Sequence, residues 1–372
     1  MHSELLLVIV VGAALLFDFT NGFHDTANVV ASVISTRAMR PGRAVGLAAV
    51  LNFIGALLSL KVAATIATGV LNVGRVTETI AFAGLTGAIA WNLITWSYGL
   101  PSSSSHALIG GMIGALLASV GGGGVHWHGV LTKVAIPAVL APLAAFVLAA
   151  VATVAIYRIV ARRRPGPINR GFRFGQLLSG SALALAHGSN DAQKTMGIIG
   201  VALVAHGSIS PHHFNVPFWV VLSAAAVMGL GTYAGGWRII RTVGSRLIKM
   251  DTAQGFTAQG AGAAVILVAS HFGYPLSSTQ VISGAVTGTG AGKGRAAVRW
   301  GVASNIVAAW LLTLPVAGLL GAGAYELTNL FGTGALGPIV IVALAATAAA
   351  GSPPVRRQFA PRLTSSDLPA TT

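Results

Sequence analysis

Long apolar runs, separated by short polar or glycine-rich stretches, dominate the chain. A helix needs about 20 apolar residues to cross the hydrocarbon core of a bilayer, so the runs predict about eleven membrane helices. The predicted helices cover residues 4–23 (with a polar continuation to 36), 43–70, 79–98, 104–120, 130–156, 175–205, 216–236, 254–272, 277–291, 298–324 and 334–351. The alternating pattern of a membrane β-barrel is not seen. We therefore predict an all-α polytopic membrane protein with about 11–12 transmembrane or re-entrant helices.

Composition supports the same class. Hydrophobic residues make up 54% of the 372 residues and charged residues only 8%, against roughly 25% charged in a soluble domain. The first run follows "MHSE", which lacks the basic region of a signal peptide, so we expect it to be a membrane helix. The chain contains no cysteine, which excludes disulfides and thiolate metal sites.

The net charge is +15, but the basic residues lie in predicted loops and do not form the single basic face that would bind nucleic acid. The basic residues gather near residues 37–43, 158–173, 238–249, 293–299 and 356–362. If each predicted helix crosses once, all five clusters lie on one side of the membrane, which the positive-inside rule makes cytoplasmic. The N-terminus is then outside and the C-terminus inside. We expect no nucleic-acid partner.

Two pairs of segments recur in the same order along the chain. Residues 21–31, "NGFHDTANVVA", match residues 187–197, "HGSNDAQKTMG", and residues 98–114 match residues 272–288. Five predicted helices separate the two starts, so the copies would enter the membrane from opposite sides, as in the inverted repeats of secondary transporters.

The duplication predicts a division of the chain into four parts. These are a first inverted repeat at 1–156, a basic cytoplasmic linker at 157–174, a second inverted repeat at 175–351 and a disordered cytoplasmic tail at 352–372. We expect the glycine-containing polar stretches to break the first helix of each repeat. We also expect Pro101 and Pro275 to precede short helices that begin with hydroxyl residues.

Asp25 and Asp191 occupy matching places in the two repeats. A charge at the centre of a bilayer costs about 2.5–3.5 kcal/mol even on the lenient scale, so a membrane carboxylate is a functional candidate. Hard cations prefer oxygen ligands, and Asn28 and Asn190 lie beside the two carboxylates. We expect these four residues to form a cation-coupling site, with the carboxylates as metal ligands if the cation is sodium. For Asp18, structural and functional roles are equally open.

The segments "PSSSSH" and "PLSSTQ" place hydroxyl groups in the first turn of a helix, where free N–H groups and the helix dipole attract anions. The candidate anion-binding hydroxyls are those of Ser103, Ser104, Ser105, Ser277, Ser278 and Thr279. Ordinary N-capping is the alternative for any one of them. The G-x-x-x-G spacing that follows in both copies permits close helix packing.

An anion beside two aspartates would be repelled in a cavity of low dielectric constant unless cations or protons bind with it. The sequence therefore predicts coupled transport. Lys194 follows Asp191 by three residues, on the same helical face, and either neutralises that aspartate or meets the anion. His24 and His187 either carry protons or bond a neighbouring helix as neutral rings.

Enzymatic functions fit less well. "GTGAGKG", residues 288–294, departs from the phosphate-binding loop pattern, and the histidines at 126, 128, 212 and 213 have no third convincing zinc ligand. We expect no cofactor and no enzyme activity.

With these motifs in view, the sequence resembles the inorganic phosphate transporter (PiT) family, particularly its bacterial low-affinity branch. The resemblance rests on "NGFHDTANVVAS", "AHGSNDAQKTMGIIG", "GLPSSSSHALIGG" and "GYPLSSTQVISGA". It implies proton- or sodium-driven transport of phosphate, free or as a metal–phosphate complex, in a homodimer. It also implies that the hydroxyls named above contact phosphate and that Asp25, Asn28, Asn190 and Asp191 serve the cation or phosphate site. Two departures are Gln280, in place of a histidine, and Gln259, in place of an acidic residue.

These observations predict a cation-coupled phosphate symporter that works by alternating access in the bacterial inner (cytoplasmic) membrane. Its partners would be phosphate, the coupling cation (H⁺ or Na⁺) and lipid. A sulfate permease on the same scaffold is the nearest alternative, and an anion channel is a further one. Phosphate carries protons near neutral pH and can donate hydrogen bonds to carboxylates, whereas sulfate cannot, so the aspartates favour phosphate.

Overall fold

The computed structural model describes residues 4–351 except 163, 212–213 and 333. Regular structure in these residues is helical, interrupted only by two isolated β-bridges, Leu71–Val125 and Ile248–Val298. The predicted all-α class is confirmed. The expected disordered tail at 352–372 lies outside the described residues.

Each predicted apolar segment lies in a helix or a bent helix pair. The helices are α1 (Glu4–Ser35), α2 (Pro41–Ala56), α3 (Lys61–Ala64), α4 (Glu78–Ser97), α5 (Ser104–Val120), α6 (Trp127–Gly129), α7 (Ile136–Val160), α8 (Pro165–His206), α9 (Phe218–Ala234), α10 (Trp237–Arg241), α11 (Thr252–His271), α12 (Ser278–Lys293), α13 (Trp300–Asn329) and α14 (Leu336–Gly351). The π-helical turns η1 (Thr65–Val70) and η5 (Thr242–Leu247) extend α3 and α10.

Several of these helices have the length and hydropathy of membrane spans. Among the described residues, 5 helices qualify, or up to 7 if each bent pair counts as one span. This is fewer than the eleven segments predicted, because α8, α11, α12 and α14 lie outside the set. α8 and α12 carry the polar motifs of the second repeat, and α14 is short. The chain is a multi-pass membrane protein.

The first helix of each repeat is not broken, and the prediction of breaks in the glycine-containing stretches was wrong. α1 and α8 run through the two polar motifs as continuous helices. Gly22 and Gly188 instead allow close packing: a Cβ at Gly22 would lie 2.7 Å from the carbonyl oxygen of Met228 in α9. A Cβ at Gly188 would lie 2.1 Å from the carbonyl oxygen of Asn52 in α2.

The interruptions occur elsewhere in each repeat. The α2–α3 pair is bent by 65° and the α9–α10 pair by 58°. Two further breaks separate α4 from α5 and α11 from α12, at the segments that contain Pro101 and Pro275. The prediction that these prolines precede hydroxyl-bearing helices is confirmed.

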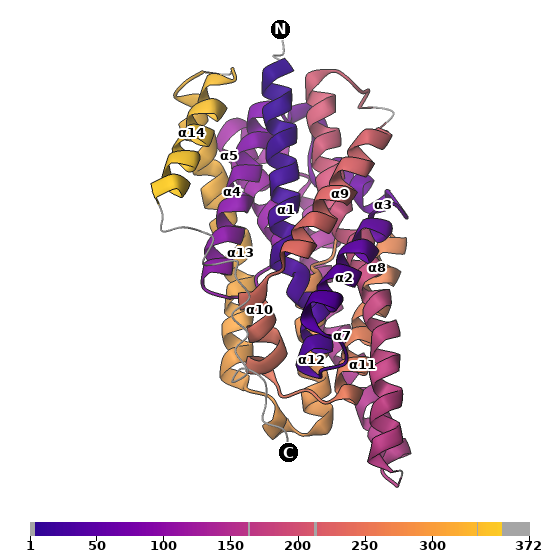
Figure 1. The fold of residues 1–372 in the computed structure, drawn as a ribbon. Coiled ribbons are helices and arrows are strands. Elements are labelled where there is room, and N and C mark those ends of the chain that lie inside the picture. The colour runs from indigo at the N-terminus through magenta and orange to yellow at the C-terminus, as the bar shows by residue number, and fades with distance from the viewer. Residues whose placement is uncertain (1–3, 163, 212–213, 333, 352–372) are drawn as a thin grey trace.

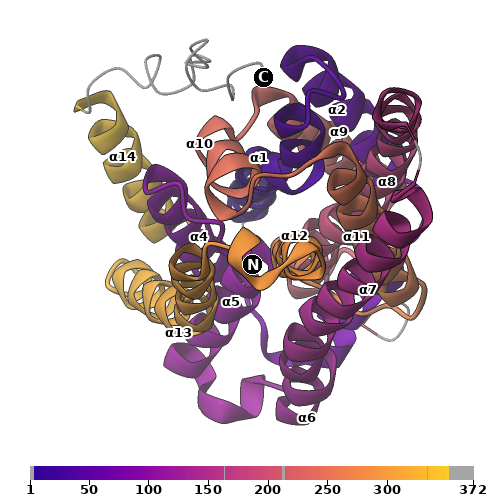
Figure 2. The ribbon, with the colours of Figure 1, turned by 90° about the horizontal axis from the view of Figure 1, so that it is seen from below.

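The order of elements recurs along the chain, with the bent pair second and the hydroxyl-bearing helix fourth in each series. Figure 1 shows α1 running downward from the N-terminal end, whereas α8 begins at the bottom of the bundle. α12 packs against α7, and α5 packs against α13, so helices from the two series are interleaved. Figure 2 shows α5 and α12 near the middle of the bundle.

The connection between the two series is largely helical. α7 ends at Val160 and α8 begins at Pro165, so most of the expected linker at 157–174 is helical. The remaining boundaries between the repeats stay a prediction.

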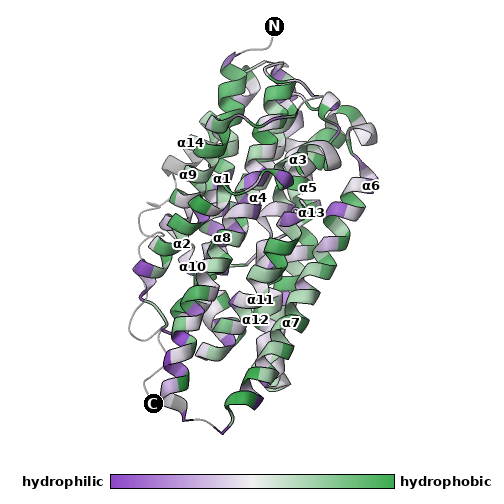
Figure 3. Ribbon diagram, turned by 90° about the vertical axis from the view of Figure 1, so that its right-hand side faces the viewer, coloured by the Kyte–Doolittle hydropathy of each residue, from purple (hydrophilic) through white to green (hydrophobic). Residues whose placement is uncertain are grey.

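The apolar core is divided into two clusters, one above and one below the polar motifs. On α1, Phe17 belongs to one cluster and Phe23 to the other. On α8, Ala186 and Ala192 are divided in the same way. On α8 the change of cluster brackets Asp191, and on α1 it falls just before Asp25, so both aspartates lie near the boundary between the two clusters. Figure 3 shows the hydrophobic residues that predominate along the long helices.

Candidate functional site

α1 and α8 bring their matching carboxylates together at the centre of the bundle. The Ser278 hydroxyl, in the first turn of α12, lies 2.8 Å from Asp191 Oδ2 and 3.3 Å from Asp25 Oδ2. Neither aspartate exposes more than 1% of its surface. One ligand atom each from Asp25, His187 and Asp191 lies within 4.8 Å of the others. The two aspartates that the sequence aligned are therefore neighbours in space.

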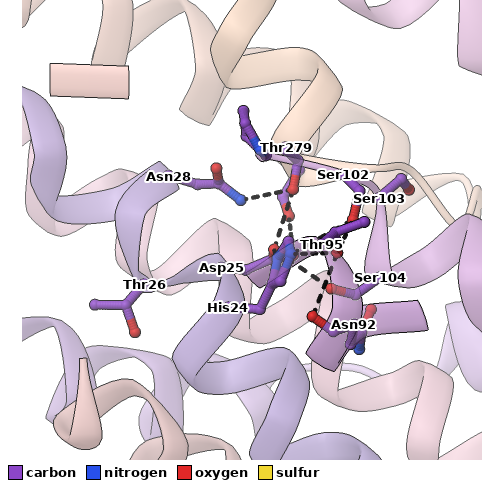
Figure 4. Close-up of polar contacts among 12 residues, drawn as sticks. His24, Asp25, Thr26, Asn28, Asn92, Thr95, Ser102, Ser103, Ser104 and Thr279 are labelled. Carbon is purple, nitrogen blue, oxygen red and sulfur yellow. Dashed lines mark hydrogen bonds and ion pairs between the residues drawn. The ribbon is translucent and has the colours of Figure 1, made fainter. Parts of the chain in front are cut away.

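The start of α5 reaches the same place. The Ser104 hydroxyl lies 3.4 Å from Asp25 Oδ1, and the Thr279 hydroxyl of α12 lies 3.1 Å from the same oxygen. Thr279 also accepts a hydrogen bond of 3.0 Å from Asn28 Nδ2. Figure 4 shows Asp25, Asn28, Ser104 and Thr279 converging, while Thr26 points away. Both hydroxyl-bearing helix starts thus face the aspartates.

Ser103 and Ser277 cap their helices instead of facing the aspartates. Ser103 is the N-cap of α5 and accepts a hydrogen bond from the backbone N–H of His106 at 3.1 Å. Ser277 is the N-cap of α12 and accepts one from Gln280 at 3.3 Å. Capping satisfies one of the N–H groups that a helix start leaves without an intrahelical acceptor. Their predicted contact with phosphate stays a prediction.

Lys194 is held among three oxygen atoms. Its ammonium group donates to the carboxylate of Asp191, to the hydroxyl of Ser105 and, at 2.7 Å, to the carbonyl oxygen of Leu276. The side chain is 1% exposed. Of the two roles that the sequence left open, the structure favours neutralisation of Asp191.

Each asparagine donates through its Nδ2 and leaves its Oδ1 without a hydrogen bond among the described residues. Asn190 Nδ2 donates to the Ser270 hydroxyl at 2.8 Å and to the Tyr274 carbonyl at 3.1 Å. Asn28 Oδ1 and Asn190 Oδ1 are buried and accept no hydrogen bond from the described residues. Amide oxygens are suitable ligands for a hard cation.

A histidine stands beside each aspartate. His24 Nδ1 lies 2.8 Å from Asp25 Oδ1, and His187 Nε2 lies 3.1 Å from Asp191 Oδ2. The other nitrogen of His187 lies 3.3 Å from Asn52 Oδ1. Both rings are buried, and each lies against the carboxylate of its aspartate.

Asp18 lies apart from this cluster. Its Oδ1 accepts a hydrogen bond of 3.0 Å from Thr195, which ties α1 to α8, and its Oδ2 is buried without a hydrogen bond among the described residues. The contact to Thr195 supports a structural role.

Sequence reasoning missed several supporting residues. Thr95 and Ser102 lie 3.3 Å and 3.4 Å from His24 Nε2. Gln280, which replaces the expected histidine, lies with Nε2 3.2 Å from His106 Nδ1. The alignment of the repeats was a signal for this last contact, because residues 106 and 280 are equivalent.

Gln259 was the second departure from the family pattern. It donates to the Val29 carbonyl of α1 at 3.0 Å instead of facing the aspartates.

The arrangement sets the chemistry that the site supports. Two carboxylates and one ammonium leave an excess of negative charge, so a further anion requires further positive charge. The first turns of α5 and α12 supply N–H groups and positive dipole ends, which bind anions. None of the predicted site residues exposes more than 4%. The site is closed in this conformation, so a ligand needs a change of conformation to enter.

Comparison with known proteins identifies relatives over most of the chain. Residues 21–321 match the model of the phosphate transporter family. A protein of Mycobacterium bovis named "Probable low-affinity inorganic phosphate transporter" is 53% identical over 345 residues, which are 92% of this chain and 83% of the relative. A protein of Rhizobium meliloti with the same name is 47% identical over 326 residues, 87% of this chain and 97% of the relative.

The fold has a solved counterpart. A structure titled "The sodium-dependent phosphate transporter" superposes with a TM-score of 0.76 at 25% sequence identity. The match covers 87% of this chain and 99% of the other. Likeness of sequence and likeness of fold point to the same family.

Proposed function

The chain belongs to the phosphate transporter family, and from this premise we propose that it imports inorganic phosphate together with a cation by alternating access. The observation that carries the proposal is the position of the Ser278 hydroxyl, which bonds Asp25 of the first repeat and Asp191 of the second. One helix start is thereby joined to the carboxylates of both halves. A ligand bound there would contact both halves at once.

Phosphate suits this place because the site offers donors and acceptors together. The starts of α5 and α12 provide donors, and the two aspartates provide acceptors. Phosphate that carries a proton donates a hydrogen bond to a carboxylate, whereas sulfate at neutral pH has no proton to donate. Ser104, Ser105, Ser278 and Thr279 are the hydroxyls that we assign to phosphate.

Cation coupling follows from charge. Asp25 has no lysine or arginine partner among the ion pairs of the described residues. Adding phosphate would place two or more negative charges in a buried volume, where repulsion is strong. A proton, a sodium ion or a metal bound to the phosphate would balance this charge. Asp25, Asn28, Asn190 and Asp191 are the residues that we assign to the cation.

The cellular setting is part of the same proposal. The similar proteins compared above come from bacteria, and the basic clusters orient the chain in a cytoplasmic membrane with its N-terminus outside. The homodimer that the family resemblance implies stays a prediction.

The test is uptake of labelled phosphate into proteoliposomes, with a pH gradient and a sodium gradient imposed separately. We expect one gradient to drive accumulation of phosphate above its external concentration, and excess sulfate not to compete. Asp25→Asn should abolish accumulation while the protein elutes as wild type on size exclusion. Accumulation at the wild-type level in Asp25→Asn, or competition by sulfate, would contradict the proposal.

A further inference from the structure

Lys194 stands where the repeat symmetry predicts an asparagine. The alignment that pairs Asp25 with Asp191 also pairs Asn28 with Lys194, and the alignment of the hydroxyl motifs pairs Thr279 with Ser105. The contacts follow this pairing across the two halves: Asn28 Nδ2 donates to Thr279, and Lys194 Nζ donates to Ser105. The halves have the same geometry at these positions but differ by one positive charge.

The oxygen atoms around the Lys194 ammonium are those of a cation site. They are a carboxylate oxygen of Asp191, a hydroxyl oxygen of Ser105 and the carbonyl oxygen of Leu276. Leu276 lies in the extended segment between α11 and α12, and unwound backbone carbonyls of this kind coordinate the driving ions of secondary transporters. The ammonium therefore fills a place that suits a small hard cation.

The ammonium has no donor left for an anion. An ammonium group carries three N–H donors, and Lys194 gives all three to protein oxygens. The side chain is almost fully buried. Its charge thus acts on Asp191 and not directly on a bound phosphate.

The equivalent position in the first half, around Asp25, has oxygen atoms but no ammonium group. Asp25 bonds the Ser104 and Thr279 hydroxyls, and Asn28 Oδ1 is buried without a hydrogen bond among the described residues. Both aspartates have a histidine nitrogen within 3.1 Å, so the presence of a histidine does not distinguish the two halves. The difference between the halves is the ammonium group itself.

We infer that Lys194 is a built-in cation that permanently occupies one of two symmetry-related cation places, so that only the Asp25–Asn28 half takes up an exchangeable cation. This inference rests on the proposed coupled transport and adds to it a reduced number of transported cations. It predicts that a chain with asparagine at position 194 has two equivalent cation places.

The experiment uses labelled sodium to count the sodium ions that bind to the purified protein in detergent. A second measurement compares the melting temperature of the protein in NaCl with that in choline chloride. Lys194→Asn, which copies Asn28, should bind one more Na⁺ per chain than wild type and gain a larger sodium-dependent shift. Lys194→Arg, which keeps the charge, is the matched control and should match wild type in both. Lys194→Gln serves if Lys194→Asn does not fold.

Equal sodium counts in Lys194→Asn and wild type would overturn the inference, and so would an extra sodium ion in Lys194→Arg. Neither measurement requires transport. Phosphate uptake by the wild-type protein is measured separately, so a wild type that fails to accumulate phosphate would refute the proposed function while the sodium count still decides the role of Lys194.

Discussion

Neighbouring serines at the start of α12 divide two tasks between them. Ser277 caps the helix by accepting a backbone hydrogen bond, whereas Ser278, the next residue, faces both aspartates. Ser103 and Ser104 repeat this division on α5. The order follows from the geometry of a helix start, where the N-cap side chain turns back to the first turn and the next side chain points away from it.

Ser278→Ala should raise the half-saturation concentration for phosphate uptake about 10-fold or more, because a hydrogen bond to a charged group contributes about 1.5–3 kcal/mol. Ser277→Ala is the control: it should lower the unfolding free energy by about 1 kcal/mol through loss of the cap and change half-saturation much less. Uptake kinetics and melting temperatures of both variants check the prediction. Equal half-saturation in Ser278→Ala and wild type would remove the hydroxyl from the phosphate site.

At this scale the sequence identified the residues but not their partners. Repetition singled out Asp25, Asp191 and the hydroxyls, and the aspartates do meet Ser104, Ser278 and Thr279. The division between capping and facing serines depends on which residue begins the helix. Of the three oxygens around Lys194, that of Asp191 was predicted from the i,i+3 spacing. Those of Ser105 and Leu276 come from distant segments, and no local pattern reveals such contacts.

The helices α1 and α8 owe their close packing to glycine. The carbonyl of Asn52 lies where a side chain at Gly188 would begin, and Gly22 meets α9 in the same manner. A glycine inside a polar stretch is equally typical of a helix break, and the sequence interpretation chose the break. The partner helix decides between the two, because only its backbone shows whether the missing Cβ is used as space for packing.

Gly188→Ala should destabilise the protein by about 1–3 kcal/mol, because its methyl group would push α8 away from α2. Gly171→Ala is a control in the same helix, since a Cβ there meets nothing within 4 Å, and it should leave stability unchanged or raise it by about 0.5–1 kcal/mol. Thermal unfolding followed by size exclusion measures both variants. If Gly188→Ala and Gly171→Ala had the same melting temperature, the packing role of Gly188 would be refuted.

For the whole molecule, the charge pattern and the number of predicted crossings predict an orientation in the membrane. Each predicted apolar segment lies in a helix or a bent helix pair, because hydropathy reports apolar length directly. Hydropathy was a weaker indicator of membrane helices for α8 and α12, because other helices of the bundle cover their polar residues. Burial inside a bundle is a property of the assembled chain and is not readable from one segment.

The orientation is testable because the chain has no cysteine of its own. Ser208→Cys, in a loop predicted outside, should react with a membrane-impermeant maleimide in intact cells. Ser245→Cys, in a basic cluster predicted inside, should react only after permeabilisation; both serines are exposed. Reaction of Ser245→Cys in intact cells would reverse the assigned orientation.

The interleaving of α12 with α7 and of α5 with α13 bears on how such a chain arose. α12 packs against α7 of the first series, and α5 packs against α13 of the second. Neither series alone therefore covers its own hydroxyl-bearing helix. If the two series descend from one inverted repeat, an ancestral protein of half this length would have left those glycine-lined faces open. A second copy of that protein, inserted in the opposite orientation, would have been needed to cover them. Gene fusion would then have freed each half to diverge.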